Sequence, residues 1–184
     1  SVFMKTGTAA DAVGYWYCTS KDGGFPGAWA PGTPGINGRV TDGTAVADNG
    51  CVMIANPATG GNYITEIIMA SSVAHQHLFF DCLWVNSGIA VTTTTAQNIT
   101  TPTLPARDVN GSTNGEGCGI ALLTTTANTN AAVNSTMTCS YTNSAGTAGR
   151  TATLFAMVGA QLPATPMIGN LIWFRLQAGD IGVQ

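Results

Sequence analysis

The chain has 184 residues, of which 45% are hydrophobic and only 8% charged, with a formal net charge of −3 and a pI near 5.0. Soluble domains carry about 25% charged residues, so such a low charge content is typical of a subunit whose surface is covered by neighbouring proteins. The Lys and Arg residues are scattered, which argues against a nucleic-acid partner, and no apolar run reaches the ~18 residues of a membrane span.

Residues 1–36 are predicted to form a short strand and an extended arm, followed by a β-sandwich domain over 37–184. The strand is predicted around 13–18. The run 23–35 is rich in glycine and proline, which disfavours both a helix and a central strand because proline lacks an N–H donor and glycine weakens regular structure.

Three aromatic residues near the N-terminus are candidate interface residues. Phe25 and Trp29 lie in the Gly/Pro-rich run, and Trp16 precedes it. Such a loop can fold back onto its own core, or its aromatic side chains can fill pockets on an adjacent subunit. Both readings stay open on the sequence.

Short apolar or alternating runs follow the arm and predict strands. These runs are 51–55, 63–70, 77–85, 118–126, 151–158 and 171–176. In the run 77–85, a period of two places Leu78, Phe80, Cys82 and Trp84 on one face. In the last run, Ile172, Phe174 and Leu176 share a face in the same way.

The clearest strand is predicted over 133–142. Met137, Cys139 and Tyr141 alternate with polar residues, as expected for a half-buried antiparallel strand. The turn residues 143–146 follow, and 151–158 returns, so 133–158 is predicted to be a hairpin. No stretch has helical periodicity with caps. Eight to ten short strands predict an all-β fold, a single antiparallel β-sandwich of jelly-roll or Ig-like type.

Metal binding and catalysis find little support in the residues. His75 and His77 share parity with Asp81, but Asp81 lies about 13 Å further along an extended strand, so we expect no metal site.

The five cysteines are Cys18, Cys51, Cys82, Cys118 and Cys139, with no paired spacing. They are interpreted as small buried hydrophobic residues, and one or two disulfides between them stay open. No GxSxG elbow or phosphate loop occurs. We expect no enzyme activity and no cofactor.

Four tryptophans bear on an alternative function, sugar binding, because sugar-binding modules present aromatic platforms on β-sandwiches. Trp84 and Trp173 lie in predicted strands and are expected in the core. Trp16 and Trp29 can be exposed, although burial at a subunit interface explains them equally well.

Four segments resemble virion structural proteins of tailed bacteriophages. They are 140–152, 92–105, Trp16 with 23–27, and 176–183, and their order covers most of the chain. The resemblance implies a component of the phage particle, with a capsid decoration or cement protein as the leading role. It implies as partners the major capsid protein or other virion subunits. A homo-oligomer around local symmetry axes is expected.

The same resemblance leaves other positions in the virion open, namely tail, fibre or head–tail junction, and a carbohydrate-binding or adhesin module is the alternative of a different class. It also implies a chain that continues past 178–180 into another strand. No signal-peptide pattern is seen, and because the sequence has no initiator Met we expect either processing or a fragment.

Overall fold

A computed structural model describes residues 4–5, 16–18, 24–25, 39–40, 58–60, 63, 65–68, 76–86, 88–90, 93–126, 137–155 and 168–184. Within these ranges the chain contains strands and no helix, and every strand pair is antiparallel. The predicted all-β class is confirmed for this part of the protein.

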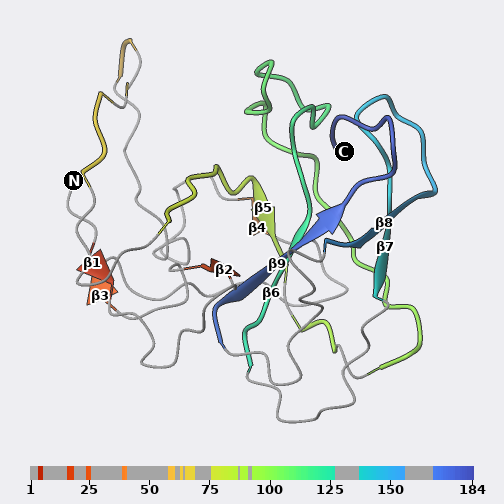
Figure 1. Cartoon of the computed structure of the whole chain (residues 1–184). Coiled ribbons are helices and arrows are strands. Elements are labelled where there is room, and N and C mark those ends of the chain that lie inside the picture. The colour runs from red at the N-terminus through yellow and green to blue at the C-terminus, as the bar shows by residue number, and fades with distance from the viewer. Residues whose placement is uncertain are drawn as a thin grey trace.

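The strands are β1 (Met4–Lys5), β2 (Trp16–Tyr17), β3 (Gly24–Phe25), β4 (Arg39–Val40), β5 (Trp84–Val85), β6 (Ala121–Leu123), β7 (Thr138–Tyr141), β8 (Arg150–Leu154) and β9 (Asn170–Arg175). The main sheet has the order β2-β9-β8-β7, and β6 also pairs with β9 (Figure 1). Two further ladders, β1-β3 and β4-β5, have two residues per strand.

Strand β9 is the centre of the main sheet because it pairs with β2, β6 and β8. Its sequence, Asn-Leu-Ile-Trp-Phe-Arg, contains the β-branched and aromatic residues that suit a pleated, half-buried surface. It contains no proline, so each of its residues can donate to a ladder. The predicted strand over 171–176 is therefore confirmed within one residue at each end.

Strands β7 and β8 form the predicted hairpin. Cys139 lies opposite Ala152, and Tyr141 lies opposite Arg150. Burial alternates along β7 as expected, with Tyr141 buried and Thr138 exposed. The described part of the 133–158 prediction is confirmed.

The core lies against one face of this sheet. Its buried hydrophobic residues, among those described, are Tyr141, Ala152 and Phe174. Partly buried side chains pack around them, namely Ile120, Leu122, Met137, Cys139, Leu154, Leu176 and Val183. The alternation in the sequence correctly assigned Phe174 and Tyr141 to inward positions.

Two loops, 108–112 and 143–147, have the same hydrogen-bond pattern. In each, the first side chain accepts from the N–H groups of the third and fifth residues, at 2.6 to 3.2 Å. The backbone N–H of the first residue (Asp108 or Asn143) donates to the carbonyl of the fifth residue. The backbone N–H of the fourth residue (Gly111 or Gly146) donates to the carbonyl of the first. The fourth residue is glycine in both, with φ of 70° and 81°, because this turn needs a left-handed residue.

The segment 181–184 lies between 115–117 and 142–144. Four backbone hydrogen bonds of 2.8 to 3.1 Å join it to them: Gly117 N–H to Ile181 O, Val183 N–H to Gly115 O, Ser144 N–H to Gly182 O, and Gln184 N–H to Thr142 O. Gly115 and Gly182 cross here so closely that a Cβ on either would overlap a backbone carbonyl oxygen. Glycine is therefore required for this packing.

The predicted strands over 63–70 and 77–85 differ from the structure. Among their described residues only Trp84 and Val85 lie in a strand, and Leu78 and Phe80, expected on a buried face, are 53% and 47% exposed. The physical reason is that a period of two shows which side chains share a face, while a packed layer must exist for that face to be buried.

Some predictions fall outside the described residues, namely those on the run 51–55, on His75, on Cys51 and on Trp29. The run 23–35 was predicted to be an irregular loop. Its described residues Gly24 and Phe25 instead form a two-residue ladder with β1, which a glycine at an edge permits.

Candidate functional site

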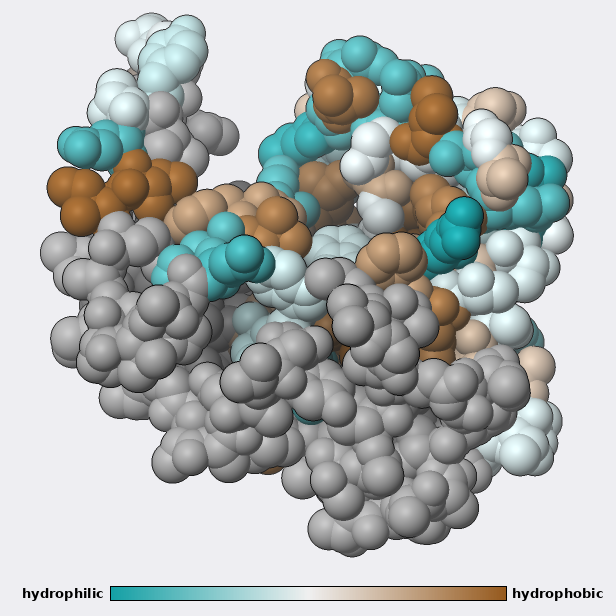
Figure 2. All heavy atoms as spheres, viewed as in Figure 1, coloured by the Kyte–Doolittle hydropathy of each residue, from teal (hydrophilic) through white to brown (hydrophobic). Residues whose placement is uncertain are grey.

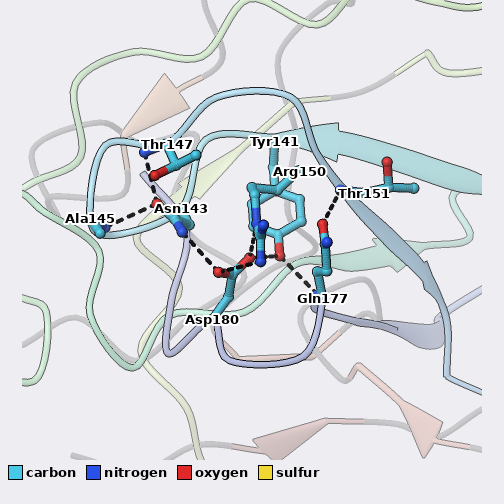
Figure 3. A network of polar contacts seen from close by, with 8 residues as sticks. All are labelled: Tyr141, Asn143, Ala145, Thr147, Arg150, Thr151, Gln177 and Asp180. Atoms are coloured by element: carbon cyan, nitrogen blue, oxygen red, sulfur yellow. Dashed lines mark hydrogen bonds and ion pairs between the residues drawn. The ribbon is translucent and has the colours of Figure 1, made fainter.

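A buried carboxylate, Asp180, is the centre of a polar cluster at the end of the hairpin (Figure 3). Its Oδ2 accepts from the Tyr141 hydroxyl at 2.5 Å and from Arg150 Nε at 2.8 Å. Its Oδ1 accepts from Arg150 Nη2 at 3.0 Å and from Asn143 Nδ2 at 2.8 Å. The Tyr141 oxygen in turn accepts from the backbone N–H of Gln177 at 2.9 Å.

The electrostatics of this cluster keep Asp180 ionised. Hydrogen bonds from Arg150 first, and from Tyr141 next, hold its pKa at about 2, below the ordinary 3.8. Burial, and then the hydrogen bond to Asp180, raise the pKa of Tyr141. A carboxylate with both oxygens engaged and its charge paired is a poor general base, so this arrangement is suited to holding segments together.

The hairpin register explains how the cluster forms. Tyr141 ends β7 and Arg150 begins β8, and their pairing places both side chains beside the turn that contains Asn143. Asp180 comes from another turn, in which its N–H donates to Gln177 O at 3.0 Å. Sequence reasoning missed this cluster. The hairpin pattern could have suggested the first three residues, but Asp180 is distant in the chain.

A second buried carboxylate, Asp108, organises the loop 108–116. It accepts from Ser112 Oγ at 2.6 Å, from Ser112 N–H at 2.6 Å, and from the N–H groups of Asn110 and Glu116 at 3.0 and 3.2 Å. These donors, with the Ser112 hydroxyl first, lower its pKa. Its oxygens face N–H and O–H donors and thereby fix the loop.

Each buried aspartate is followed by an exposed aliphatic residue. Val109 is 71% exposed and Ile181 is 63% exposed. The two lie around Gly117, whose N–H donates to Ile181 O and whose Cα faces the Val109 side chain. Figure 2 shows brown side chains set among hydrophilic ones at this end of the molecule. We call Val109 and Ile181 the loop-end pair.

A second exposed apolar group lies before β5. Leu78 and Phe79 are 53% and 58% exposed, and the next residue, Phe80, packs edge-on against Trp173 of β9 with ring centroids 5.6 Å apart. Asp81 accepts from Arg107 Nε at 2.9 Å and from Nη2 at 3.2 Å. We call Leu78, Phe79, Asp81 and Arg107 together the pre-β5 patch.

The two predicted interface residues that the structure describes belong to different sheets. Trp16 is half-buried in β2 and pairs with Leu171 of β9, whereas Phe25 belongs to β3 and Trp29 lies outside the described residues. Trp84 and Trp173, expected in the core, are half-buried.

The other residues weighed as sites are the histidine–aspartate set and the cysteines. His77 is exposed, and the Asp81 carboxylate is engaged by Arg107. In the part of the chain that the structure describes, no three His, Cys, Asp or Glu residues gather in a group that could hold a metal ion. Cys18, Cys82, Cys118 and Cys139 are half-buried, whereas they were expected to be buried. Burial raises the pKa of the Cys139 and Cys118 thiols.

An open depression of about 300 Å³ lies beside the 181–184 segment. Its lining comprises Thr101, Pro102, Thr103, Leu104, Thr113, Thr142 and Gln184. None of these side chains is an acid, a base or a thiol, so the lining side chains include no base that would activate the threonine hydroxyls as nucleophiles.

No described segment forms a helix able to cross a membrane. The comparisons with known proteins give no match, whether with family models, with curated proteins or with solved structures.

Proposed function

We propose that this chain is a structural subunit of a tailed-bacteriophage particle, acting as a capsid decoration or cement protein that stabilises the head. The observation that carries the proposal is the exposure of large apolar side chains next to segments held by buried carboxylates. Val109 and Ile181 are 71% and 63% exposed and directly follow Asp108 and Asp180.

Physical considerations support an assembly role. Single exposed hydrophobic residues are ordinary, but a clustered set on a monomer marks interaction sites. Loops that hydrogen bonds already order lose little conformational entropy on binding. The chain's charge content of 8% also lowers the desolvation cost of covering its surface.

The finer fold belongs to the same proposal. We infer a single β-sandwich of jelly-roll or Ig-like type whose one layer is the main sheet, because that sheet buries one face. Residues 1–36 would supply an arm that reaches a neighbouring subunit. Phe25, Trp29 and Trp16 are its proposed anchors, since aromatic residues dominate the energetics of interfaces.

The test adds the purified chain to phage heads that lack it. We expect saturable co-sedimentation, greater resistance of the heads to heat, and electron-microscopic density at sites where capsid subunits meet. Val109→Ser and Ile181→Ser each weaken binding by about 10-fold, and Trp29→Ala does the same if the arm anchors the subunit.

Three results would contradict the proposal in whole or in part. A chain that stays in the supernatant at every concentration is not a head component. Density confined to the tail or fibre would retain a virion role but reject the capsid position, while saturable glycan binding that quenches tryptophan fluorescence would support the sugar-binding alternative.

A further inference from the structure

Two asparagine–glycine pairs lie in the loop 108–116, and their surroundings differ. They are the pairs 110–111 and 114–115; two further pairs, at 37–38 and 49–50, fall outside the described residues. In such a pair the backbone nitrogen of the glycine can attack the side-chain carbonyl carbon of the asparagine, because glycine has no Cβ to obstruct the approach. The attack requires a side chain that is free to turn and a nitrogen that no other contact holds.

The fold holds both reacting groups of the first pair. Asn110 Nδ2 donates to Glu116 Oε2 at 2.7 Å, which fixes the side-chain amide. The N–H of Gly111, whose nitrogen would attack, donates to Asp108 O at 2.9 Å. Both hydrogen bonds must open before the two groups can meet, so the folded loop protects Asn110.

The second pair lacks these restraints. The Asn114 side chain is exposed, and among the residues that the structure describes no group bonds to its amide; the hydrogen bond of this residue is made by its backbone N–H, to Ser112 Oγ at 3.2 Å. Gly115 is held through its carbonyl, which accepts from the N–H groups of Cys118 and Val183 at 3.1 Å each. Its nitrogen donates to no group in the described ranges.

We propose that Asn114 is a site of spontaneous deamidation in the folded protein. The Gly115 nitrogen forms a bond to Asn114 Cγ, the Cγ–Nδ2 bond breaks, and the Gly115 N–H proton passes through water to the departing nitrogen, which leaves as ammonia. Water then opens the resulting succinimide ring at either of its carbonyls. One product has aspartate at position 114. The other has isoaspartate there, so that the main chain runs through the former side chain and is longer by one carbon atom.

The isoaspartate product acts on the 181–184 segment. A Cβ on Gly115 would already overlap the Val183 carbonyl oxygen, so this crossing has no room for a displaced main chain. An additional backbone atom directly before Gly115 shifts that residue and weakens its hydrogen bond from Val183 N–H, together with the neighbouring bond from Gly117 N–H to Ile181 O. The inference goes beyond the proposed function and holds for this chain whatever it binds.

The first test incubates the purified full chain in mildly alkaline buffer, both folded and in concentrated urea, and follows each pair by peptide mapping with tandem mass spectrometry. In the folded chain we expect conversion at Asn114 to be ~10-fold or more faster than at Asn110, because two hydrogen bonds protect the latter. In urea the two rates become similar, since both restraints are lost. Equal rates in the folded chain, or conversion at Asn114 that occurs only in urea, would overturn the proposal.

Two variants separate the causes of the selectivity. Asn114→Gln should abolish conversion at position 114, because the longer side chain must close a less favourable ring, and should leave the rate at Asn110 unchanged. Glu116→Ala removes the acceptor of Asn110 Nδ2 and should speed up conversion at Asn110 but not at Asn114. A rate at Asn110 that stays at the wild-type value in Glu116→Ala would overturn the explanation by hydrogen bonding.

The second test compares unreacted wild type, chain with isoaspartate at position 114, and Asn114→Asp, which carries the new charge without the additional backbone atom. Hydrogen exchange of the Val183 and Gly117 N–H groups should be about 10-fold faster in the isoaspartate form than in the other two, which should resemble each other. Equal exchange in all three forms would overturn the link between this site and the 181–184 segment.

Discussion

Arg150 and Asp180 form a two-point ion pair, with Nε 2.8 Å from Oδ2 and Nη2 3.0 Å from Oδ1. The side chain of Asp180 is 4% exposed, and that of Arg150 is 25% exposed. The pair joins the start of β8 to the turn before the 181–184 segment. That segment also forms backbone bridges with Glu116 and Asn143, so the ion pair anchors the hairpin to a segment that contacts both the 108–116 and the 143–147 loops.

Asp180→Asn should lower the midpoint of thermal unfolding by several degrees, because it leaves the Arg150 guanidinium without its counter-charge in a site mostly removed from water. Circular dichroism melting at pH 7 measures this. Asp81→Asn is the matched control, since its ion pair with Arg107 is exposed and such pairs contribute about 0–1 kcal/mol. Equal losses in the two variants would show that burial of the Asp180 pair has no energetic consequence.

Acid should weaken the fold through the same carboxylate. The pKa of Asp180 is about 2 in the folded chain and near its ordinary 3.8 when unfolded, so its contribution is complete above the unfolded value and is lost as pH falls through the folded one. Urea unfolding measures the free energy of unfolding of the wild type and of Asp180→Asn between pH 7 and pH 2. The difference between these two free energies should shrink below about pH 4. A difference in free energy that stays constant over this pH range would contradict the assignment of the acid sensitivity to Asp180.

Alkali should act through Tyr141. Its pKa is raised above the ordinary 10.0 by burial and by the hydrogen bond to Asp180, so its stabilisation is present below pH 10 and is lost as pH rises through the folded pKa. Tyr141→Phe should reduce stability at neutral pH and flatten this alkaline loss. Tyr63→Phe, at a side chain 87% exposed, should change neither, and an identical alkaline profile for wild type and Tyr141→Phe would count against the mechanism.

The glycine crossing predicts a sharp difference between two Gly→Ala substitutions at similar φ. Gly146 has φ of 81° and open space around it, so Gly146→Ala should cost about 1–2 kcal/mol from the left-handed backbone alone. Gly115 has φ of 74° and faces the Val183 carbonyl oxygen, so Gly115→Ala should cost about 1–3 kcal/mol more through overpacking. Denaturant unfolding compares them, and similar losses would show that the 181–184 segment moves aside easily.

The sequence predicted the strands and turns that depend on residues close together in the chain. Alternation along 137–141 predicted β7, its burial and its turn, and the apolar run at 171–176 predicted β9, because these patterns depend on near neighbours in the chain. The same reasoning did not find the Asp180 cluster. Its members meet across 30 to 39 residues, and no local pattern specifies which turn will pack beside which hairpin.

Alternation, readable from the sequence, predicted the all-β class that the described part of the protein has, and the low charge content suggested a surface made for contact. Only the tertiary structure decided which apolar residues stay uncovered. Leu78 and Phe80 have the pattern of a buried face but remain about half exposed, because burial requires a second layer in space, and a one-dimensional pattern contains no record of that layer.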